Sequence, residues 1–499
     1  MVAPMKPKSG DAAGDRPRAR ARGSWLTAAA VAKASGGDVL QRGPAAAGVV
    51  TDSRTDCAGR LFVALRGPSH DGHAFASAAV RGGAAGLLVS RPLHELPDLE
   101  RALAARAQAP FVVRVADTGK ALLDLAGEHR RRHRARVVGI TGSCGKTSTK
   151  EWLGAVLAAA MPTVRSPGSF NNQVGVPLTL FAIGPDTRAA VVEIGTNAPG
   201  EIAQLAAVAR PEIGIVTCVA AAHLEGLGSL EGVAREKSAL PASLPADGLC
   251  ILNGDDAACR AMAATTKARV QFTSVSRPAD WFATDVRFHA LGTTFLLQGE
   301  RPVTLPRLGT HNVYNALAVI AAASWLGVAE EDVLRALAQV PSASRRLEPK
   351  SAGDVTVFDD TYNMNPQSAA AALQALAGLP GGGRRIVVFG EMLELGATSE
   401  ALHRALGAEV ARTRQDLLVC VGAGASPIAD GAIAAGMSAA AVHRVVDAGA
   451  AFDLLRARVR GGDRVLCKAS RRIALDRLVD RLVAELGGER TAAAEGSGG

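Results

Sequence analysis

Residues 141–148 (TGSCGKTS) combine two glycines, a lysine and several hydroxyl side chains. The apolar run 135–140 before them is rich in β-branched residues and predicts a strand, and the residues from Thr149 onward predict a helix. Strand, glycine loop and helix together form the setting of a phosphate-binding loop, in which backbone amides and the helix N-terminus face the anion. Lys146 could reach the β- and γ-phosphates of a nucleotide, and Thr147 could bind Mg²⁺.

The match to the phosphate-binding motif is partial, because the full Walker pattern has a glycine at the position of Ile140. Residues 142–147 still supply the Gly-x-x-Gly-Lys-Thr core of the motif. Taken alone, this core predicts a bound nucleotide phosphate and leaves open what the phosphate is used for.

Three further polar residues follow predicted elements of the same region. Glu193 lies near the end of an apolar strand at 189–195, where a Walker-B acid would hold the metal, although many strands end in a glutamate. His223 follows a second apolar strand at 211–217 and could ligate a metal, but a histidine there is more often structural. Lys237 lies on a predicted helix, where a solvated surface lysine is the ordinary interpretation.

Composition narrows the class of protein. The 499 residues suggest roughly three domains. The chain is 48% hydrophobic and 4% aromatic, so its cores should be aliphatic. No apolar stretch reaches the roughly 18 residues of a membrane helix, so no membrane span is expected. The seven cysteines form no Cys-x-x-Cys pair, which favours reduced thiols in the cytoplasm.

The formal net charge of +9 could indicate a nucleic-acid partner. The densest basic cluster is 130–134, but no interleaved aromatic residues or RNA-binding signature accompany it. A solvated helix end and a basic N-terminal tail therefore explain the charge better, and we expect no nucleic acid. Anionic small molecules such as nucleotides also suit a basic protein.

Alternating strand and helix patterns predict an α/β protein of three domains. The expected parts are a disordered basic tail (1–24), a small mixed α/β N-terminal domain (25–115), a central P-loop ATPase-like domain with a mainly parallel sheet (116–349), a Rossmann-like doubly wound C-terminal domain (350–488) and a flexible tail (489–499). Within the central domain, residues 268–306 predict short antiparallel strands.

Polar residues cluster where predicted strands end, which is where ligands tend to bind in α/β sheets. Ser53, Arg54 and His73 stand at such places in the first domain, and turn chemistry explains them as well as ligand contacts do. The polar loop SPGSFNNQVGVPLT contains Asn171 and Asn172. It is either an ordinary connection or an element that grips a substrate.

Many short motifs occur in one order along the chain. They are TDSR (51–54), LFVALRG (61–67), DGH (71–73), TGSCGKTSTK (141–150), FNNQVGVPLT (170–179), EIGTNAPGEI (193–202), AAHLEGLGSLEGVAREK (221–237), LNGDD (252–256), GTHNVYNAL (309–317), SRRLE (344–348), DDTYNMNPQS (359–368), GEMLELG (390–396) and CKASR (467–471). In these motifs the chain resembles the Mur ligases, and most closely the MurF-type ligases, which join D-alanyl-D-alanine to UDP-N-acetylmuramoyl-tripeptide.

Two motifs are typical of the MurF type within this family: Tyr-Asn-x-Asn-Pro at 362–366 and Asn-Asn-x-x-Gly-Val-Pro at 171–177. The ligases that add the third amino acid have an Asp-Asn-Pro-Arg motif in the last domain, which is absent here. Folylpolyglutamate synthetases share the central chemistry but not this N-terminal domain.

The resemblance implies an ATP-dependent ligase that uses Mg²⁺ and works through an acyl phosphate in the cytoplasm, as a monomer. Its implied catalytic residues are Lys146, Lys237 and His223. Its implied ATP-binding residues are Gly142, Ser143, Cys144, Gly145, Lys146, Thr147, Ser148, Asn312, Arg346 and Asp360. Its implied metal ligands are Thr147, Glu193, His223 and Lys237, the last carbamylated by CO₂. Its implied substrate contacts are Ser53, Arg54, His73, Asn171, Asn172, Asn363 and Asn365. Because these residues come from three predicted domains, catalysis should require domain closure.

The chain departs from the family pattern at a few positions. Ala239 replaces a glutamate often found two residues after the modified lysine. Arg345 adjoins Arg346, so the sequence assigns the nucleotide contact to Arg346 only through its Arg-Leu pair. Two other functions stay open: a Mur-type ligase with a different amino acid donor, and a P-loop NTPase that drives signalling or nucleic-acid binding.

Overall fold

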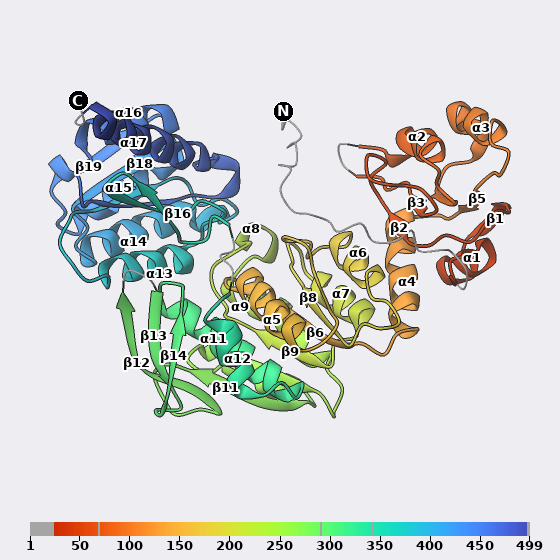
Figure 1. The fold of residues 1–499 in the computed structure, drawn as a ribbon, viewed down its shortest axis with the longest axis horizontal. Helices are drawn as coiled ribbons and strands as arrows, with labels where there is room; N and C mark the ends of the chain where they lie inside the picture. Colours follow the sequence, from red (N-terminus) through yellow and green to blue (C-terminus); the bar gives the residue numbers. More distant parts are fainter. Residues whose placement is uncertain (1–23, 68–69, 290–291, 341–343, 497–499) are drawn as a thin grey trace. The chain divides into compact units, whose positions relative to one another are not determined.

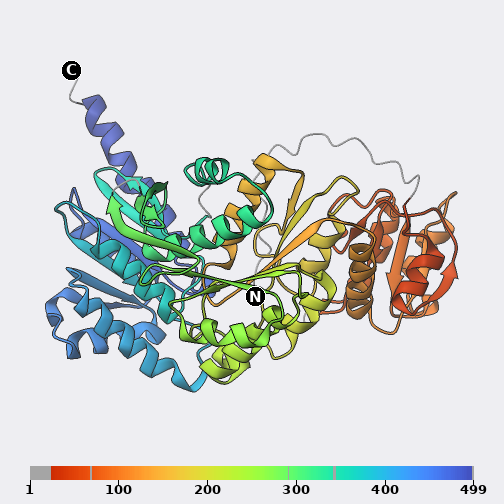
Figure 2. The same ribbon diagram turned by 90° about the horizontal axis from the view of Figure 1, so that it is seen from below.

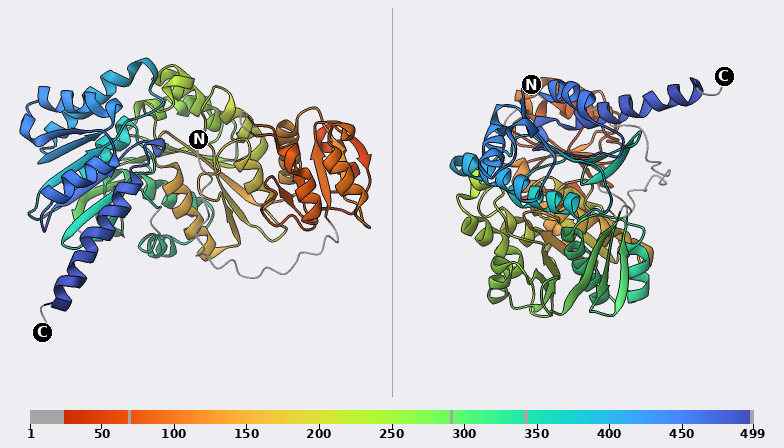
Figure 3. Two further views of the ribbon diagram at one scale, coloured as in Figure 1. Left: turned by 90° about the horizontal axis from the view of Figure 1, so that it is seen from above. Right: turned by 90° about the vertical axis from the view of Figure 1, so that its left-hand side faces the viewer.

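The computed structural model describes residues 24–67, 70–289, 292–340 and 344–496, with side chains described as far as 487. Its internal contacts divide the chain into two compact units, Met1–His129 and Arg130–Gly499. Figures 1, 2 and 3 show the ribbon from four sides.

The first unit is built on a five-stranded sheet with the order β1-β5-β4-β3-β2. Only the edge strand β1 runs antiparallel to its neighbour, and the other pairs are parallel. Its elements are α1 (Ala28–Ser35), β1 (Asp38–Gln41), β2 (Val49–Val50), β3 (Leu61–Val63), η1 (Gly72–Phe75), α2 (Ala76–Arg81), β4 (Gly86–Val89), η2 (Leu93–Glu95), α3 (Pro97–Ala104), β5 (Phe111–Arg114) and α4 (Thr118–Arg131).

The strands of this first sheet are short runs of apolar residues. All residues of β3 and β4 are buried, as expected for parallel strands that are covered on both faces. One face packs against α2 and α3 through an aliphatic cluster. The unit is therefore a small mixed α/β domain, as the sequence predicts.

The second unit contains a nine-stranded sheet with the order β14-β13-β12-β11-β10-β9-β6-β8-β7. Its strands are β6 (Arg136–Thr141), β7 (Thr163–Arg165), β8 (Ala189–Glu193), β9 (Ile213–Val216), β10 (Leu249–Asn253), β11 (Arg269–Ser274), β12 (Trp281–His289), β13 (Gly292–Leu297) and β14 (Arg301–Leu305). Its helices are α5 (Lys146–Ala160), α6 (Gly175–Phe181), α7 (Glu201–Ala209), α8 (Leu224–Leu227), α9 (Leu230–Ala242), α10 (Ala257–Ala261), η3 (Met262–Thr265), α11 (Thr310–Trp325) and α12 (Glu330–Leu337).

Helices cover both faces of the nine-stranded sheet (Figure 1). The helices α5, α11 and α12 pack on one face in the largest apolar cluster of the described chain. The helices α8, α9 and α10 contribute to a second cluster on strands β9 and β10. The strand β6 lies inside the sheet between β8 and β9, so the loop that follows it opens at the carboxyl edge.

The prediction of antiparallel strands over 268–306 is right for only part of that segment. The strands β12, β13 and β14 form an antiparallel meander. The strand β11, in contrast, pairs in parallel with both β10 and the start of β12. The meander therefore extends the parallel sheet rather than forming a separate one. The alternating residues could not reveal this, because the residues of a half-buried strand alternate in either direction of pairing.

The second unit also contains a six-stranded sheet with the order β15-β16-β20-β17-β18-β19, in which only β15 is antiparallel. Its strands are β15 (Glu348–Ala352), β16 (Val355–Asp360), β17 (Arg385–Phe389), β18 (Leu417–Val421), β19 (Val442–Val445) and β20 (Arg464–Lys468). Its helices are α13 (Pro366–Ala377), η4 (Gly396–Thr398), α14 (Ser399–Arg412), η5 (Ala423–Ala425), α15 (Ser426–Ala434), η6 (Ala439–Ala441), α16 (Ala448–Arg458), η7 (Arg471–Ile473) and α17 (Asp476–Gly496).

This six-stranded sheet is doubly wound. The helices α13, α14 and α15 pack on one face, and α16 and α17 pack on the other. In Figures 2 and 3 the C-terminal end of α17 extends beyond the other helices of this sheet. Together the three sheets confirm the predicted mixed α/β fold with mostly parallel strands.

The predicted limit of the first domain and the two predicted tails can be compared with the described residues. The expected limit at 115 precedes α4, and the first compact unit continues through most of that helix to His129. Residues 1–23 of the expected basic tail and the last three residues lie outside the description, while residues 489–496 continue α17. Among the described residues, none of the helices has the length and apolar character that a membrane crossing needs.

Candidate active site

The glycine loop between β6 and α5 has a backbone that only glycine allows at two positions. Gly142 has a φ of 145°, and a Cβ added there would lie 1.9 Å from the hydroxyl oxygen of Thr217. Gly145 has a φ of 83°, and a Cβ added there would lie 2.5 Å from Oδ1 of Asn315. Both positions therefore require glycine, because the backbone has a positive φ and a neighbouring side chain lies too close for a Cβ atom.

The segment after β9 holds this loop in place. The amide of Ser143 donates to the carbonyl oxygen of Cys218 at 2.9 Å. The hydroxyl oxygen of Ser143 accepts from the amide of Ala220, also at 2.9 Å. The loop is therefore preorganised by hydrogen bonds to a neighbouring strand end.

The first turn of α5 begins directly after the loop. No side chain caps the helix at Gly145, so its first-turn N–H groups remain for an anion. Nζ of Lys146 folds back and donates to the carbonyl oxygen of Gly142 at 2.6 Å. A phosphate at this place would meet backbone amides, the helix dipole and an ammonium group.

Glu193 ends β8 beside the loop and is 1% exposed. Its Oε1 accepts hydrogen bonds from the hydroxyl of Thr147 at 3.2 Å and from Nδ2 of Asn171 at 2.8 Å. Its Oε2 is buried and has no hydrogen-bond partner among the described residues. A buried carboxylate oxygen without a partner is costly, so this atom is suited to a ligand.

The chemistry of these donors fits Mg²⁺. A carboxylate and a hydroxyl are hard oxygen ligands, which Mg²⁺ prefers, and Mg²⁺ sites usually take one or two carboxylates together with substrate phosphates. In the described parts of the chain, no group of three or more His, Cys, Asp or Glu side chains is arranged to hold a metal by itself. Metal binding here would therefore depend on other oxygen donors.

His223 lies at the start of α8 in a left-handed conformation, with a φ of 56°. Its Nδ1 lies 2.7 Å from Oε2 of Glu394. Burial lowers the pKa of His223, the charges of Lys146 and Lys237 lower it further, and Glu394 opposes them. A neutral imidazole, which these effects favour, is the form that can bind a metal ion.

Lys237 lies on α9 and is 1% exposed. Burial, with the charge of Lys146 as the next cause, lowers the pKa of Lys237 to about 7. Lys146, His223 and Lys237 line one small cavity of about 70 Å³, which Asn171 also reaches. Lys237 therefore loses its proton much more readily than an ordinary lysine does.

A larger cavity of about 740 Å³ joins the carboxyl edges of the two sheets of the second unit. Its lining from the nine-stranded sheet includes the glycine loop and Asn312, and its lining from the six-stranded sheet includes Arg346, Asp360, Asn363, Asn365 and Lys468. Nη2 of Arg346 donates to the hydroxyl oxygen of Thr147 at 3.0 Å. The Arg346 guanidinium also lies over the ring of Tyr362, 4.2 Å from its centroid.

Asp360 ends β16 at the base of this cavity. Its Oδ2 accepts from Nζ of Lys468 at 2.6 Å, and its Oδ1 accepts from the amide of Leu347 at 3.1 Å. Burial raises the pKa of Asp360, while the charge of Lys468 acts in the opposite direction. The structure brings Arg346 to the cavity, while Arg345 is not among the residues that line it.

Comparison with known proteins matches this chain to two family models. Residues 140–323 match the Mur ligase middle domain, and residues 345–471 match the Mur ligase glutamate ligase domain. The chain is 40% identical to the UDP-N-acetylmuramoyl-tripeptide–D-alanyl-D-alanine ligase of Escherichia coli over 75% of this chain and 81% of that protein. It is 34% identical to the ligase of the same name from Bacillus subtilis, over 87% and 93%. This chain belongs to the Mur ligase family, within its MurF type.

Solved structures agree with this assignment. A crystal structure of MurF from Acinetobacter baumannii matches with a TM-score of 0.82 and 30% identity, over 92% of this chain and 99% of that one. The MurF ligase of Thermotoga maritima, solved in complex with ADP, matches with a TM-score of 0.76 and 25% identity, over 88% and 98%. The resemblance seen in the sequence motifs is confirmed.

The remaining predicted residues of this Mur ligase's second unit lie near the two cavities. Asn312 is buried; its Nδ2 donates to the carbonyl oxygen of Leu308 at 2.8 Å. Asn365 caps α13, and its side-chain amide lies 3.2 Å from Sγ of Cys144 in the glycine loop. The carbonyl oxygen of Asn363 accepts from Lys468 at 3.0 Å.

The polar loop after β7 is shorter than the sequence indicates, because α6 begins at Gly175. Oδ1 of Asn172 accepts from the amides of Val174 at 3.2 Å and Gly175 at 2.9 Å, which starts that helix. Asn171 binds Glu193 through its side chain, and its carbonyl oxygen accepts from Gly195 at 2.8 Å. Both asparagines also line the small cavity.

The candidate substrate residues of the first unit differ in their surroundings. The side chain of His73 is fully buried; its Nδ1 lies 2.5 Å from Asp71, and its Nε2 accepts from the amide of Ser90 at 2.9 Å. Both ring nitrogens are therefore engaged within the unit, which favours turn chemistry for His73. Arg54 is 78% exposed and pairs with Asp52, and Ser53 is half-buried.

Several residues that line the large cavity or hold its walls have no role predicted from the sequence. These are Lys150, His311, Tyr362, Glu394 and Lys468. Each of these residues lies inside one of the sequence motifs given above, with Lys150 at the end of its motif. This position in a motif was the sequence feature that could have indicated a functional role. Their partners are distant in the chain, and spacing alone could not show which of them meet.

Proposed function

We propose that this chain joins D-alanyl-D-alanine to UDP-N-acetylmuramoyl-tripeptide by ATP-dependent amide-bond formation, in the synthesis of peptidoglycan precursors. The observation that carries the proposal is the similarity to ligases of this name, at 34% to 40% identity over 81% to 93% of their length. The cavities of the second unit support it with the groups that such a reaction needs. ATP use is also supported by the related MurF structure that contains ADP.

The chemistry sets clear demands on the site. A carboxylate does not react with an amine in water, because it is a poor electrophile and its oxygen is a poor leaving group. A carboxylate oxygen of the tripeptide attacks the γ-phosphorus of ATP, ADP leaves, and an acyl phosphate forms. The amine of D-alanyl-D-alanine then attacks the acyl carbon, loses a proton, and phosphate leaves. Positioning and charge stabilisation therefore dominate catalysis.

The glycine loop supplies the phosphate cradle in this proposal. Residues 142–148 bind the ATP phosphates through backbone amides and the start of α5. Lys146, now hydrogen-bonded to Gly142, turns toward the β- and γ-phosphates and stabilises the charge that develops during transfer. Cys144 contributes through its backbone, since its side chain bonds Asn365.

Thr147 and Glu193 are the proposed ligands of a first Mg²⁺, and the partnerless Oε2 of Glu193 supports this assignment. His223 and a carbamylated Lys237 are the proposed ligands of a second. When bound, Mg²⁺ would neutralise phosphate charge and polarise the γ-phosphoryl group. Asn171 orients Glu193 by its hydrogen bond.

Carbamylation of Lys237 has a physical basis in the structure. An ammonium group cannot bind a metal, and only a neutral amine attacks CO₂. The burial that lowers the pKa of Lys237 to about 7 supplies this neutral amine. The nitrogen bonds to the carbon of CO₂ and loses a proton, which gives an anionic carbamate with oxygen donors. The proposed catalytic roles of Lys146, His223 and Lys237 rest on the small cavity that all three residues line.

The six-stranded sheet completes the proposed ATP site. Arg346 and Asp360 contact the nucleotide from one side of the large cavity, and Asn312 lies near the adenine. Asn363 and Asn365 approach the dipeptide or the nucleotide. In the first unit, Ser53, Arg54 and the turn held by His73 bind the uridine diphosphate part. The proposed domains follow these roles, with limits at 25–115, 116–349 and 350–488.

The proposed partners are the two substrates, with no nucleic acid and no second copy of the chain. A cytoplasmic location belongs to the same proposal, because ATP and UDP-linked precursors are cytoplasmic metabolites. The seven cysteines, all free in the structure, are compatible with a reducing compartment.

The test is an ADP-release assay with UDP-N-acetylmuramoyl-tripeptide and D-alanyl-D-alanine, each alone and together. Tripeptides with diaminopimelate or lysine as the third residue are used in parallel. ADP release that requires both substrates supports the proposal. Release stimulated by nucleic acid would support a P-loop NTPase instead, and a requirement for a different amino acid donor would indicate another Mur-type ligase.

A substitution in the glycine loop tests the assignment of the site. Lys146→Ala should abolish ADP release while the far-UV circular dichroism and the melting temperature stay close to those of the wild type. The exposed Lys120→Ala is the matched control, with unchanged activity expected. Full activity in Lys146→Ala would refute the phosphate-binding role.

A further inference from the structure

The short segment 345–347 enters the six-stranded sheet with an unusual backbone. Arg345 has a φ of 62° and Leu347 has a φ of 50°, so two residues with bulky side chains adopt the left-handed conformation on either side of Arg346. Such a conformation is unfavourable for these residue types and persists only where surrounding contacts enforce it. The contacts of this segment therefore call for an explanation.

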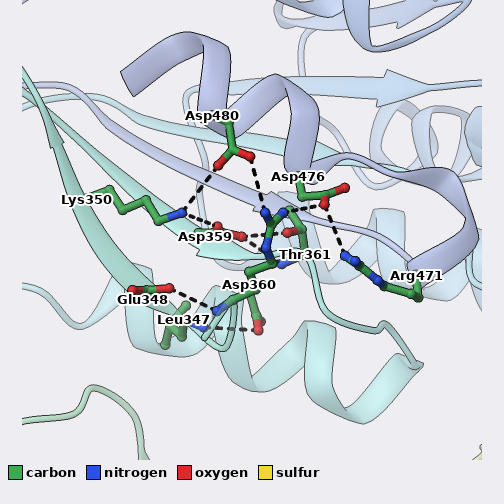
Figure 4. Close-up of polar contacts among 10 residues, drawn as sticks. Leu347, Glu348, Lys350, Asp359, Asp360, Thr361, Arg471, Asp476 and Asp480 are labelled. Carbon is green, nitrogen blue, oxygen red and sulfur yellow. Dashed lines mark hydrogen bonds and ion pairs between the residues drawn. The ribbon is translucent and has the colours of Figure 1, made fainter. Parts of the chain in front are cut away.

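Two carboxylates of the C-terminal helix contact the two terminal nitrogens of the Arg345 guanidinium. Its Nη1 lies 2.5 Å from Oδ2 of Asp476, and its Nη2 donates to Oδ2 of Asp480 at 3.2 Å. These two carboxylates are four residues apart and lie on one side of α17 (Figure 4). The side chain of Arg345 is 24% exposed, so the ion pairs are partly shielded from water.

The backbone of Arg345 is held as well. Its amide donates to Oε2 of Glu348 at 2.9 Å, and its carbonyl oxygen accepts from the amide of Tyr362 at 3.1 Å. The amide of Leu347 donates to Oδ1 of Asp360 at 3.1 Å. The residues on both sides of Arg346 are thus tied to fixed elements.

The same charged cluster continues to the strand that carries Asp360. Lys350 lies 2.6 Å from Oδ2 of the buried Asp359 and 3.7 Å from Oδ1 of Asp480 (Figure 4). Asp359 also accepts from the hydroxyl of Thr361 at 2.6 Å. Figure 4 shows these side chains directed toward one another between α17 and the strands β15 and β16. The cluster therefore connects α17 with the strand end beside the large cavity.

Arg346 points away from this cluster. Its guanidinium reaches Thr147 on α5 and lies over the ring of Tyr362, whose hydroxyl donates to Oγ of Ser169 at 2.5 Å. Arg346 is thus a contact between the strand end of the six-stranded sheet and the phosphate-binding helix. The two residues that flank it, Arg345 and Leu347, are the ones in the left-handed conformation.

We propose that Arg345 is a positioning residue, which uses Asp476 and Asp480 of α17 to hold the 345–347 segment so that Arg346 reaches the nucleotide phosphates. The C-terminal helix thereby contributes to nucleotide binding without touching the nucleotide. This inference rests on the proposed use of ATP, because Arg346 is assigned to that ligand.

Equilibrium binding of ADP, measured by calorimetry on the full chain, is the primary test. Arg345→Ala should weaken ADP binding roughly tenfold, a change of about 1.4 kcal/mol. Arg345→Lys should recover part of this loss, because a lysine still pairs with one carboxylate but cannot form the two-ended contact. In the ligase assay the KM for ATP should rise by a similar factor, with a smaller change in kcat.

A double-mutant cycle separates positioning from general stability. If Arg345 acts through Arg346, then Arg345→Ala should weaken ADP binding in the wild-type background and have little further effect when Arg346→Ala is already present. Equal effects in both backgrounds would overturn the proposal. Arg404→Ala is the matched control, because Arg404 also pairs with two carboxylates, Glu400 and Asp430, and should leave ADP binding unchanged.

A milder variant covers the case in which Arg345→Ala does not fold. Asp480 is 55% exposed, and Asp480→Asn removes one of the two contacts of Arg345 at little cost to folding. It should weaken ADP binding about two- to threefold. Unchanged ADP affinity in both Arg345→Lys and Asp480→Asn would overturn the inference. Failure of the wild-type chain to bind ADP would instead refute the proposed function.

Discussion

Two lysines of the second unit are buried to the same degree and have opposite surroundings. Lys150 on α5 is 0% exposed, and Lys237 on α9 is 1% exposed. Nζ of Lys150 donates to Oε1 of Glu151 at 2.5 Å and to the carbonyl oxygens of Ser166 at 2.9 Å and Gly168 at 2.6 Å. For Nζ of Lys237, no hydrogen-bond or ion-pair partner exists among the described residues.

This difference teaches that burial alone does not make a lysine reactive. Three acceptors replace the hydrogen bonds to water that the ammonium group of Lys150 loses on burial. Two of them are carbonyl oxygens of the loop after β7, so Lys150 holds that loop in place. Lys237 lacks such acceptors, and burial lowers its pKa to about 7, although the charges of Cys218, Cys144 and Glu236 act in the opposite direction. One buried lysine therefore holds the structure, and the other offers a neutral amine to the small cavity.

The loop that Lys150 fastens leads directly to the active site. Residues 166–168 precede Ser169, which bonds Tyr362, and Asn171, which bonds Glu193. Lys237 lines the small cavity beside the proposed metal site, while Lys150 lines neither cavity and can act on that site only through the loop that it holds. The following predictions separate these two contributions.

The largest effect is expected for Lys237→Ala. If Lys237 becomes the carbamate that holds a metal, ligase activity should fall by roughly a thousandfold or more, as for the loss of a group essential to phosphoryl transfer. Short carboxylic acids added to Lys237→Ala should restore part of the activity, because they supply the missing oxygen donor. Native mass spectrometry of the wild type should show a CO₂ adduct that Lys237→Ala lacks.

Lys150→Ala is the matched control for this rescue. Both variants lose a buried lysine, but short carboxylic acids cannot replace the donors of Lys150. Rescue of both variants would contradict the distinction between the two lysines. Near-normal activity of Lys237→Ala, without rescue of either variant, would contradict it as well.

A smaller effect is expected for Lys150→Met, which keeps much of the side-chain volume. The carbonyl oxygens of Ser166 and Gly168 would lose a buried donor, which should reduce the free energy of unfolding by about 1–3 kcal/mol. The loosened loop should orient Asn171 and Glu193 less well and lower kcat/KM by roughly 10- to 100-fold. Chemical denaturation and ADP-release kinetics measure the two changes, and an unaltered kcat/KM would show that the loop does not depend on Lys150.

The sequence predicts part of this comparison. The glycine loop, Glu193 and Lys237 could be named as candidates, because short motifs preserve the order of neighbouring residues, and their roles stay predictions. The partners of Lys150 could not, since Ser166 and Gly168 meet it only after the chain passes through β7. Tertiary packing, which short motifs do not show, decides which buried ammonium groups find hydrogen-bond acceptors.

The fold was predictable to a similar extent. Apolar runs revealed the parallel strands, such as β16 and β20, because buried strands are continuous in apolar residues. The parallel pairing of β11 was missed, since pairing direction depends on chain connections and not on residue alternation. The sequence separated Arg346 from Arg345 only by the Arg-Leu pair, and it gave no sign that Arg345 pairs with Asp476 and Asp480 far along the chain.

The pH dependence of stability gives a third prediction, which concerns folding and not turnover. In CO₂-free buffer, Lys237 releases its proton near pH 7 in the folded chain and near 10.5, its ordinary value, in the unfolded chain. Between these values the unfolded state binds more protons, so the free energy of unfolding should rise with pH, by at most about 1.4 kcal/mol per pH unit. Denaturation curves from pH 6 to 10 should show a steeper rise in the wild type than in Lys237→Met, because groups such as Cys144, whose pKa is also lowered, contribute equally to both proteins. A parallel pH dependence in both proteins would mean that Lys237 is protonated normally.

The smallest effect is expected for Cys144→Ser in the glycine loop. A hydrogen bond from Cys218 lowers the pKa of Cys144, and a negative charge on Cys144 is one of the effects that raise the pKa of Lys237. The serine variant removes this charge but keeps the backbone that binds phosphate, so ligase activity should change less than about threefold. The pH above which native mass spectrometry detects the CO₂ adduct should move slightly lower, because the amine of Lys237 becomes easier to deprotonate. A shift to higher pH would show that the field of the glycine loop does not reach Lys237 in this way.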